Sequence, residues 1–202
     1  GDFLVIPIKT LGRTGMEVTQ LGYGSMGLRG PNSWGVRIVD DEDSDRFLNL
    51  VLDSGINFID TANIYSAGES EIHIGHWLTG KRHRVLIATK FGLNMGNGPM
   101  QQGGSRQHMM ASVEARLGRL QTDYIDLYQI HRVDRSIPIE ETLGALDDLV
   151  RSGKVRYIGA SNFDAWHLCE AEWVARTRHL NRFVSVQNYY NLRKREIERE
   201  VT

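Results

Sequence analysis

Apolar segments typical of β-strands alternate with amphipathic segments typical of helices along most of this chain. The predicted strands begin at Asn57, Val85, Tyr124, Val155 and Val184. Their spacing of roughly 30 to 40 residues matches a strand followed by a crossover helix, which is the βαβ unit. Such alternation predicts the α/β class, with a parallel sheet covered by helices. No linker interrupts the pattern, so we expect one domain over residues 1–202.

Turn and capping signals place the other elements. Lys9–Gln20 predicts a β-hairpin turned on Gly15, a first strand is expected near Leu21–Gly24, and a long loop is expected over 28–43. Residues that favour helix N-termini precede four stripes with the helical period, at Ser44, Ser105, Pro138 and Asp164. Glycines that favour helix C-termini follow two of these stripes, at Gly55 and Gly153.

Charge and composition exclude several classes of protein. The 24 basic and 25 acidic side chains leave a net charge of -1, which gives no global signal for nucleic acid or for an anionic membrane. The single cysteine fits a reducing compartment, and no apolar stretch is long enough to span a bilayer. We therefore expect a cytoplasmic protein without a nucleic-acid or membrane partner, and its oligomeric state stays open.

Four side chains that can handle protons lie at or just beyond the ends of predicted strands. They are Asp60, Tyr65, Lys90 and His131. In a parallel β/α barrel the carboxyl ends of the strands meet at one mouth, where the loops build the active site. Each residue alone is more often a cap, a surface residue or a packing residue. Their combination predicts that they converge in an active site.

A glycine-rich string at 22–27 (GYGSMG) matches the dinucleotide-binding pattern G-x-G-x-x-G. That pattern requires a helix to begin at the third glycine, because the helix N-terminus holds the pyrophosphate. Here a loop-like segment, Leu28–Pro31, follows instead. The sequence therefore disfavours a doubly wound nucleotide-binding fold. Close backbone approach at a strand end explains the glycines better.

Six segments spread over nearly the whole chain match one known family in order and in spacing. They are 11–15 (LGRTG), 58–65 (FIDTANIY), 88–92 (ATKFG), 123–131 (DYIDLYQIH), 153–163 (GKVRYIGASNF), and Gln187 with 190–192 (YNL). With these segments the chain resembles the aldo-keto reductases. The resemblance implies a (β/α)8 TIM barrel with an N-terminal β-hairpin. It also implies reduction of aldehydes and ketones with NADP(H), in preference to NAD(H).

The resemblance assigns a role to each of the four converging residues. Tyr65 matches the proton donor, and a phenol, with an ordinary pKa of about 10, is protonated at neutral pH. Lys90 matches the ammonium that stabilises the phenolate, and Asp60 matches the carboxylate that positions the lysine. His131 matches the residue that hydrogen-bonds the substrate carbonyl and orients it.

Cofactor contacts follow from the same resemblance. Ser161, Asn162 and Gln187 match residues that hydrogen-bond the nicotinamide carboxamide, for which neutral donors and acceptors are suited. Ser25 and Met26 match positions lining the nicotinamide ribose, and Asp60 is counted with the cofactor-binding residues too. For Ser161 and Asn162, a turn before the next helix is the alternative interpretation.

Other predictions concern the substrate and a metal. Trp34 and Phe91 lie in segments near the predicted mouth and are candidates to line an apolar substrate pocket, with core packing as an equally open alternative. The specific carbonyl substrate is not indicated. His73 and His76 lie three residues apart on a predicted helix, but no third ligand follows at matching spacing, so we expect a surface pair and no metal site.

Two alternatives to an active reductase remain open. Potassium-channel beta subunits share this barrel and cofactor site and act as regulatory partners of other proteins, although they carry Asn where this chain has His131. The second is an inactive, truncated barrel, because strands seven and eight have no counterpart among the 202 residues. We expect a fragment, a shortened product or a barrel completed by another chain, with about six of the eight β/α units present.

Overall fold

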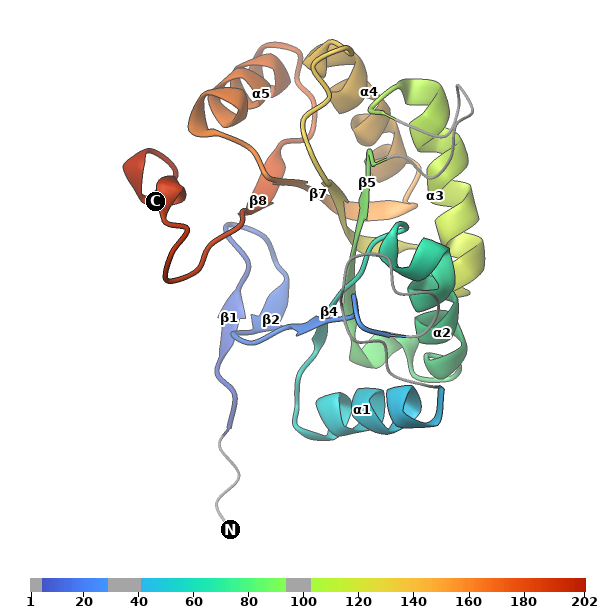
Figure 1. The fold of residues 1–202 in the computed structure, drawn as a ribbon. Helices are drawn as coiled ribbons and strands as arrows, with labels where there is room; N and C mark the ends of the chain where they lie inside the picture. Colours follow the sequence, from blue (N-terminus) through green and yellow to red (C-terminus); the bar gives the residue numbers. More distant parts are fainter. Residues whose placement is uncertain (1–4, 29–40, 94–102) are drawn as a thin grey trace.

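Six parallel strands form one curled sheet in the computed structural model, which describes residues 5–28, 41–93 and 103–202 (Figure 1). In spatial order they are β3 (Tyr23–Gly24), β4 (Phe58–Asp60), β5 (Leu86–Phe91), β6 (Ile125–Ile130), β7 (Val155–Ser161) and β8 (Phe183–Gln187). Spatial order equals chain order, as it does in the wall of a β/α barrel. The predicted starts of the last five strands are confirmed to within one residue.

Among the described residues, five α-helices cover the outer face of this sheet. They are α1 (Asp41–Asp53), α2 (Glu69–Trp77), α3 (Arg106–Leu120), α4 (Ile139–Arg151) and α5 (Ala165–Thr177) (Figure 1). Ser105 caps α3 as predicted, because its hydroxyl accepts a hydrogen bond from the backbone N–H of His108. Pro138 and Asp164 are also N-caps. The prediction for Ser44 is wrong: it lies inside α1 and is fully buried.

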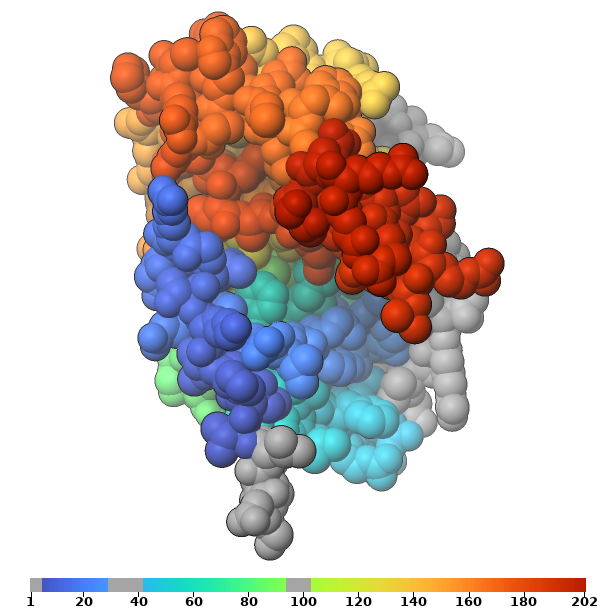
Figure 2. All heavy atoms as spheres, turned by 90° about the vertical axis from the view of Figure 1, so that its left-hand side faces the viewer, coloured from blue at the N-terminus to red at the C-terminus, as the bar shows by residue number. Residues whose placement is uncertain are grey.

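A β-hairpin of β1 (Ile8–Thr10) and β2 (Glu17–Thr19) precedes the sheet. Its antiparallel pairing confirms the predicted hairpin, but Gly12 rather than Gly15 adopts the left-handed conformation, with φ of 59°. A Cβ at Gly12 would lie 2.7 Å from the carbonyl oxygen of Val184, so the hairpin approaches β8 closely. Figure 2 shows the hairpin and the C-terminal segment on the same face of the molecule.

Strand alternation divides the core into an interior and an outer layer. Ala88 and Leu127 point into the curl of the sheet and pack with Met16 of the hairpin. The outer layer lies between the sheet and the helices, in one cluster around α1 and α2 and a larger one around α3, α4 and α5. All six residues of β6 are buried, as expected for a parallel strand covered on both faces.

Three short segments complete the described elements: η1 (Tyr65–Gly68), η2 (Arg82–Arg84) and η3 (Glu196–Arg199). In the described part of the chain, none of the helices combines the length and the apolar character needed to cross a bilayer.

The close contact between α2 and α3 predicts that one added methyl group will strongly lower the stability of the protein. A Cβ at Gly75 would lie 2.2 Å from the carbonyl oxygen of Arg119 and 2.8 Å from the carbonyl carbon of Leu120. Because these are backbone atoms, Gly75→Ala must push the helices apart, and we expect the free energy of unfolding to fall by about 1–3 kcal/mol. Chemical denaturation measures the change.

Gly118→Ala is the matched control, because Gly118 lies in α3 with no atom within 4 Å of an added Cβ. Alanine is the better helix former, so this variant should be as stable as the wild type or more stable by up to about 1 kcal/mol. Equal stability of Gly75→Ala and Gly118→Ala would contradict the close packing of α2 on α3.

Candidate active site

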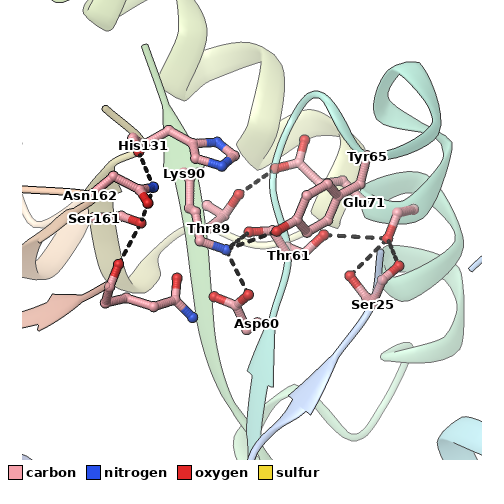
Figure 3. A network of polar contacts seen from close by, with 12 residues as sticks. Ser25, Asp60, Thr61, Tyr65, Glu71, Thr89, Lys90, His131, Ser161 and Asn162 are labelled. Atoms are coloured by element: carbon pink, nitrogen blue, oxygen red, sulfur yellow. Dashed lines mark hydrogen bonds and ion pairs between the residues drawn. The ribbon is translucent and has the colours of Figure 1, made fainter. Parts of the chain in front are cut away.

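The Lys90 ammonium is the centre of a buried cluster at the carboxyl ends of β4 and β5 (Figure 3). Its Nζ lies 2.6 Å from Asp60 Oδ2, 3.2 Å from the Thr61 carbonyl oxygen and 3.2 Å from Tyr65 Oη. Lys90 is only 2% exposed. A buried ammonium requires partners for its donors, and these three oxygens supply them.

Parallel pairing of adjacent strands explains how Lys90 reaches Asp60. Asp60 ends β4 and pairs in register with Ala88 of β5. Lys90 lies two residues further along β5, so its side chain is on the same interior face as that of Ala88. Its long side chain extends to the Asp60 carboxylate on the neighbouring strand. Tyr65 lies just beyond β4, and its buried ring places the hydroxyl against the same ammonium.

Burial and ion pairing act in opposite directions on Asp60. Burial raises the pKa of the Asp60 carboxyl above its ordinary value, and the charge and hydrogen bond of Lys90 counteract the rise. Oδ2 is held by Lys90, whereas Oδ1 is buried without a hydrogen-bond partner among the described residues. The carboxylate is therefore half satisfied and retains capacity to accept a hydrogen bond.

His131 directly follows β6, and its backbone N–H donates to the carbonyl oxygen of Phe91 at 2.7 Å. Its ring stands edge-on to that of Tyr65, with 6.3 Å between the ring centroids. Burial, reinforced by the Lys90, Arg132 and Arg116 charges, lowers the pKa of His131 from 6.5 to about 4. The imidazole is therefore neutral at physiological pH, so it can donate one hydrogen bond without carrying charge.

Ser161 ends β7 and Gln187 ends β8, and a hydrogen bond joins them. Ser161 and Asn162 lie next to His131 (Figure 3). The Ser161 hydroxyl donates to the Gln187 carbonyl oxygen at 2.7 Å. The Asn162 amide nitrogen lies 3.0 Å from both the His131 carbonyl oxygen and the Ser161 hydroxyl. Asn162 itself is left-handed, with φ of 57°. The Asn162 and Gln187 side chains are exposed at the mouth, although the Asn162 amide nitrogen, like the Ser161 hydroxyl, is already hydrogen-bonded within the turn.

Ser25 and Met26 follow β3, beside Asp60. The backbone N–H of Ser25 donates to the Asp60 carbonyl oxygen at 2.9 Å. The Ser25 hydroxyl is fully buried and accepts a hydrogen bond from Ser70 at 2.8 Å, while Met26 is partly exposed. Ser25 is therefore at the predicted place, but its side chain points into the protein and its hydroxyl is engaged.

Of the two candidates for a substrate pocket, the structure describes only Phe91, which does not line the mouth. Phe91 is fully buried and stacks on Tyr128 in the outer core layer, with 4.6 Å between the ring centroids. Because Lys90 points inward, its neighbour on the strand must point outward toward the helices. Core packing, the alternative interpretation, therefore describes Phe91. Trp34 lies outside the described residues.

The histidine pair on α2 is not a surface pair. His73 is buried, with its Nε2 3.1 Å from Asp45 Oδ1, and His76 alone is exposed. Within residues 5–28, 41–93 and 103–202, no group of three or more His, Cys, Asp or Glu side chains is arranged to hold a metal ion.

Sequence reasoning missed the charged residues behind the site. Glu71 and Arg116 are fully buried, and Arg116 donates to the Lys90 carbonyl oxygen at 2.6 Å. A signal was present, because Arg116 occupies a position of the buried α3 stripe between Val113 and Leu120. A charge in an apolar stripe indicates a buried partner.

Comparison with known proteins identifies the family of this chain. The family model of the aldo/keto reductase family matches residues 20–202. The chain is 39% identical over 216 residues to the aldo-keto reductase dtxS3 of Metarhizium robertsii, covering 95% of this chain and 58% of that protein. It is 41% identical over 202 residues to the uncharacterized oxidoreductase YrpG of Bacillus subtilis, covering 95% of this chain and 60% of that protein.

A third relative is the versiconal hemiacetal acetate reductase of Aspergillus parasiticus, 39% identical over 211 residues, with coverage of 95% of this chain and 61% of that protein. The chain thus spans about three fifths of the length of these relatives. The family match covers nearly all of this chain, including every described strand of the curled sheet. The chain belongs to the aldo/keto reductase family.

Proposed function

We propose that the protein reduces aldehydes and ketones to alcohols with NAD(P)H, and that Tyr65 donates the proton. The observation that carries this proposal is the position of one phenol against one ammonium. Tyr65 Oη lies 3.2 Å from Lys90 Nζ, and Asp60 holds that ammonium at 2.6 Å. A protonated hydroxyl beside a fixed positive charge is suited to deliver a proton to an oxygen that becomes negative.

Each residue of the cluster has a defined role in the reduction of the substrate carbonyl. Tyr65 donates its proton to the carbonyl oxygen, and Lys90 stabilises the phenolate that remains. Asp60 fixes the Lys90 ammonium and limits its freedom to turn away from the phenol. The His131 imidazole donates a second hydrogen bond to the same oxygen. Its lowered pKa, about 4, keeps the ring uncharged while it does so.

The mouth fits a nicotinamide carboxamide, which needs neutral donors and acceptors. The Asn162 and Gln187 amides are exposed there, and the unpartnered Asp60 Oδ1 lies close by. When bound, the reduced nicotinamide supplies the hydride. Asn162 and Gln187 would hold the carboxamide and so fix which ring face meets the substrate. We propose NADP(H) in preference to NAD(H), in keeping with the family resemblance.

The names of the relatives support reductase chemistry. Two of them are called reductases, one of them a versiconal hemiacetal acetate reductase. We propose that this protein accepts a broad range of aldehydes and ketones, and a simple aromatic aldehyde is a suitable first substrate. Failure to reduce any compound in a wide carbonyl panel would exclude the proposed function.

Loss of the Tyr65 hydroxyl should remove the proton donor. We expect Tyr65→Phe to lower kcat by about 10²–10⁴-fold, the usual contribution of a positioned general acid. The dissociation constant for NADPH, measured by nicotinamide fluorescence, should stay nearly unchanged, because the hydroxyl serves the substrate. Tyr157→Phe is the control, since the Tyr157 hydroxyl contacts the backbone of Gly15 in the hairpin instead. Full activity of Tyr65→Phe would refute the assignment.

Removal of either amide at the mouth should weaken cofactor binding. We expect Gln187→Ala and Asn162→Gly each to raise the dissociation constant for NADPH by about 5- to 30-fold, the loss of one or two hydrogen bonds. Glycine is chosen at Asn162 because the backbone is left-handed there. Asn49→Ala, on α1, removes an amide that accepts from Trp77 instead and should bind normally. Unchanged NADPH binding by both site variants would contradict their role.

The His131 ring should titrate well below the ordinary range of histidine. A folded-state pKa of about 4 means that the folded protein does not take up the proton that the unfolded chain binds as the pH falls from 6.5 to 4. The free energy of unfolding should therefore decrease across this window. NMR titration of the ring, assigned with His131→Asn, measures the midpoint. A midpoint near 6.5 would show that His131 is charged more readily than its surroundings indicate.

A further inference from the structure

A cluster of buried charges lies directly behind Lys90, on the outer face of β5. Glu71 of α2 and Arg116 of α3 have fully buried side chains, with Arg116 Nε 3.4 Å from Glu71 Oε1. Arg119, also of α3, donates from Nε to Glu71 Oε2 at 2.8 Å and is partly exposed. Charges this deep in a protein are retained only when each is paired and hydrogen-bonded.

This cluster is attached to the strand that carries the catalytic lysine. Thr89 donates its hydroxyl hydrogen to Glu71 Oε1 at 2.6 Å (Figure 3). Arg116 Nη2 donates to the Lys90 carbonyl oxygen at 2.6 Å, and Arg116 Nη1 lies 3.1 Å from the Tyr128 hydroxyl. Thr89 points outward to this cluster, whereas Lys90 points inward to the site. The contacts on the outer face therefore hold the stretch of β5 backbone from which the Lys90 ammonium extends.

The same cluster is attached to the segment that carries Tyr65. Tyr65 begins η1, and the chain then passes through Ser66, Ala67 and Gly68, with φ of 49°, 56° and 97°, into α2 and Glu71. Left-handed residues other than glycine are strained and persist only where their surroundings hold them. Arg119 lies beside the end of this segment, because a Cβ built on Gly68 would be 3.3 Å from its Cδ, and its guanidinium binds Glu71.

We propose that Glu71, paired with Arg116, is a positioning residue for the reaction: it ties the Tyr65 segment to the Lys90 strand and so sets the contact between phenol and ammonium. Glu71 touches neither of these reactive groups. It acts through Thr89 and Arg116 on one side and through the short chain to Tyr65 on the other. A displacement of reacting groups by about 1 Å can lower the rate by about 10²-fold. The gain in rate from a fixed spacing can therefore outweigh the cost of burying the charges of Glu71 and Arg116. This inference rests on the proposed function.

Glu71→Gln tests the proposal, because it keeps the shape of the side chain and removes its charge. With wild-type turnover of an aromatic aldehyde as reference, kcat should fall by about 10- to 100-fold. The KM for the aldehyde and the dissociation constant for NADPH should each change by less than about threefold, since neither binding surface is altered. A purely structural role would lower stability without this separation of kcat from binding.

Asp147→Asn is the matched control for the loss of a buried carboxylate. Asp147 of α4 is 4% exposed and accepts hydrogen bonds from Asn181 and Arg151, away from Lys90. Compared at temperatures equally far below each melting midpoint, Asp147→Asn should keep kcat within about twofold of the wild type. An equal loss of kcat in both variants, or an unchanged kcat in Glu71→Gln, would overturn the proposal.

Thr89→Val provides a second test if Glu71→Gln does not fold. It removes one hydrogen bond to Glu71 with little change in shape, and kcat should fall by about 3- to 10-fold while KM is kept. Unchanged kcat in this variant would overturn the proposal. Tyr65→Phe belongs in the same series: a wild type without turnover rejects the proposed function itself. If the wild type is active and Tyr65→Phe is impaired, but the Glu71 and Thr89 variants are fully active, only the positioning role is rejected.

Discussion

The buried ion pair between Lys90 and Asp60 is the interaction on which the geometry of the site depends. Withdrawing both charges from water is costly, and good geometry with further hydrogen bonds must offset that cost. The 2.6 Å contact, the Thr61 carbonyl and the Tyr65 hydroxyl provide them. The same contacts that satisfy the ammonium also aim it at the phenol. Burial of the lysine and placement of the Tyr65 hydroxyl are therefore one structural requirement.

Strand β5 serves two environments because its residues alternate between faces. Ala88 and Lys90 face the interior, where Lys90 meets Asp60, whereas Thr89 and Phe91 face the helices. Parallel register with β4 places Asp60 opposite Ala88, within reach of the lysine. The outer face then holds the strand through Glu71 and Arg116 on two different helices. A shift of β5 by one residue would exchange the two environments and destroy both at once.

The order of strands and the convergence of Asp60, Tyr65, Lys90 and His131 were predictable from sequence, because both follow from apolar periodicity and from the rule that parallel strand ends share one edge. Single-residue features were less predictable. Ser44 has the character of a cap but lies inside α1, and Gly12 rather than Gly15 takes the left-handed turn. Phe91 was ambiguous because an aromatic residue at a strand end suits either a pocket or a core. The Glu71–Arg116 pair joins two helices, and no local pattern tells which buried charge another will meet.

The central claim is that this cluster moves a proton and a hydride to one carbonyl group. Incubation of the protein with an aromatic aldehyde and NADPH in which both hydrogens at C4 of the nicotinamide are deuterium, followed by mass spectrometry and NMR of the product, tests it most directly. The account predicts an alcohol with deuterium on the carbinol carbon and a solvent-exchangeable proton on oxygen. An alcohol without deuterium at that carbon, or no alcohol at all, would contradict it.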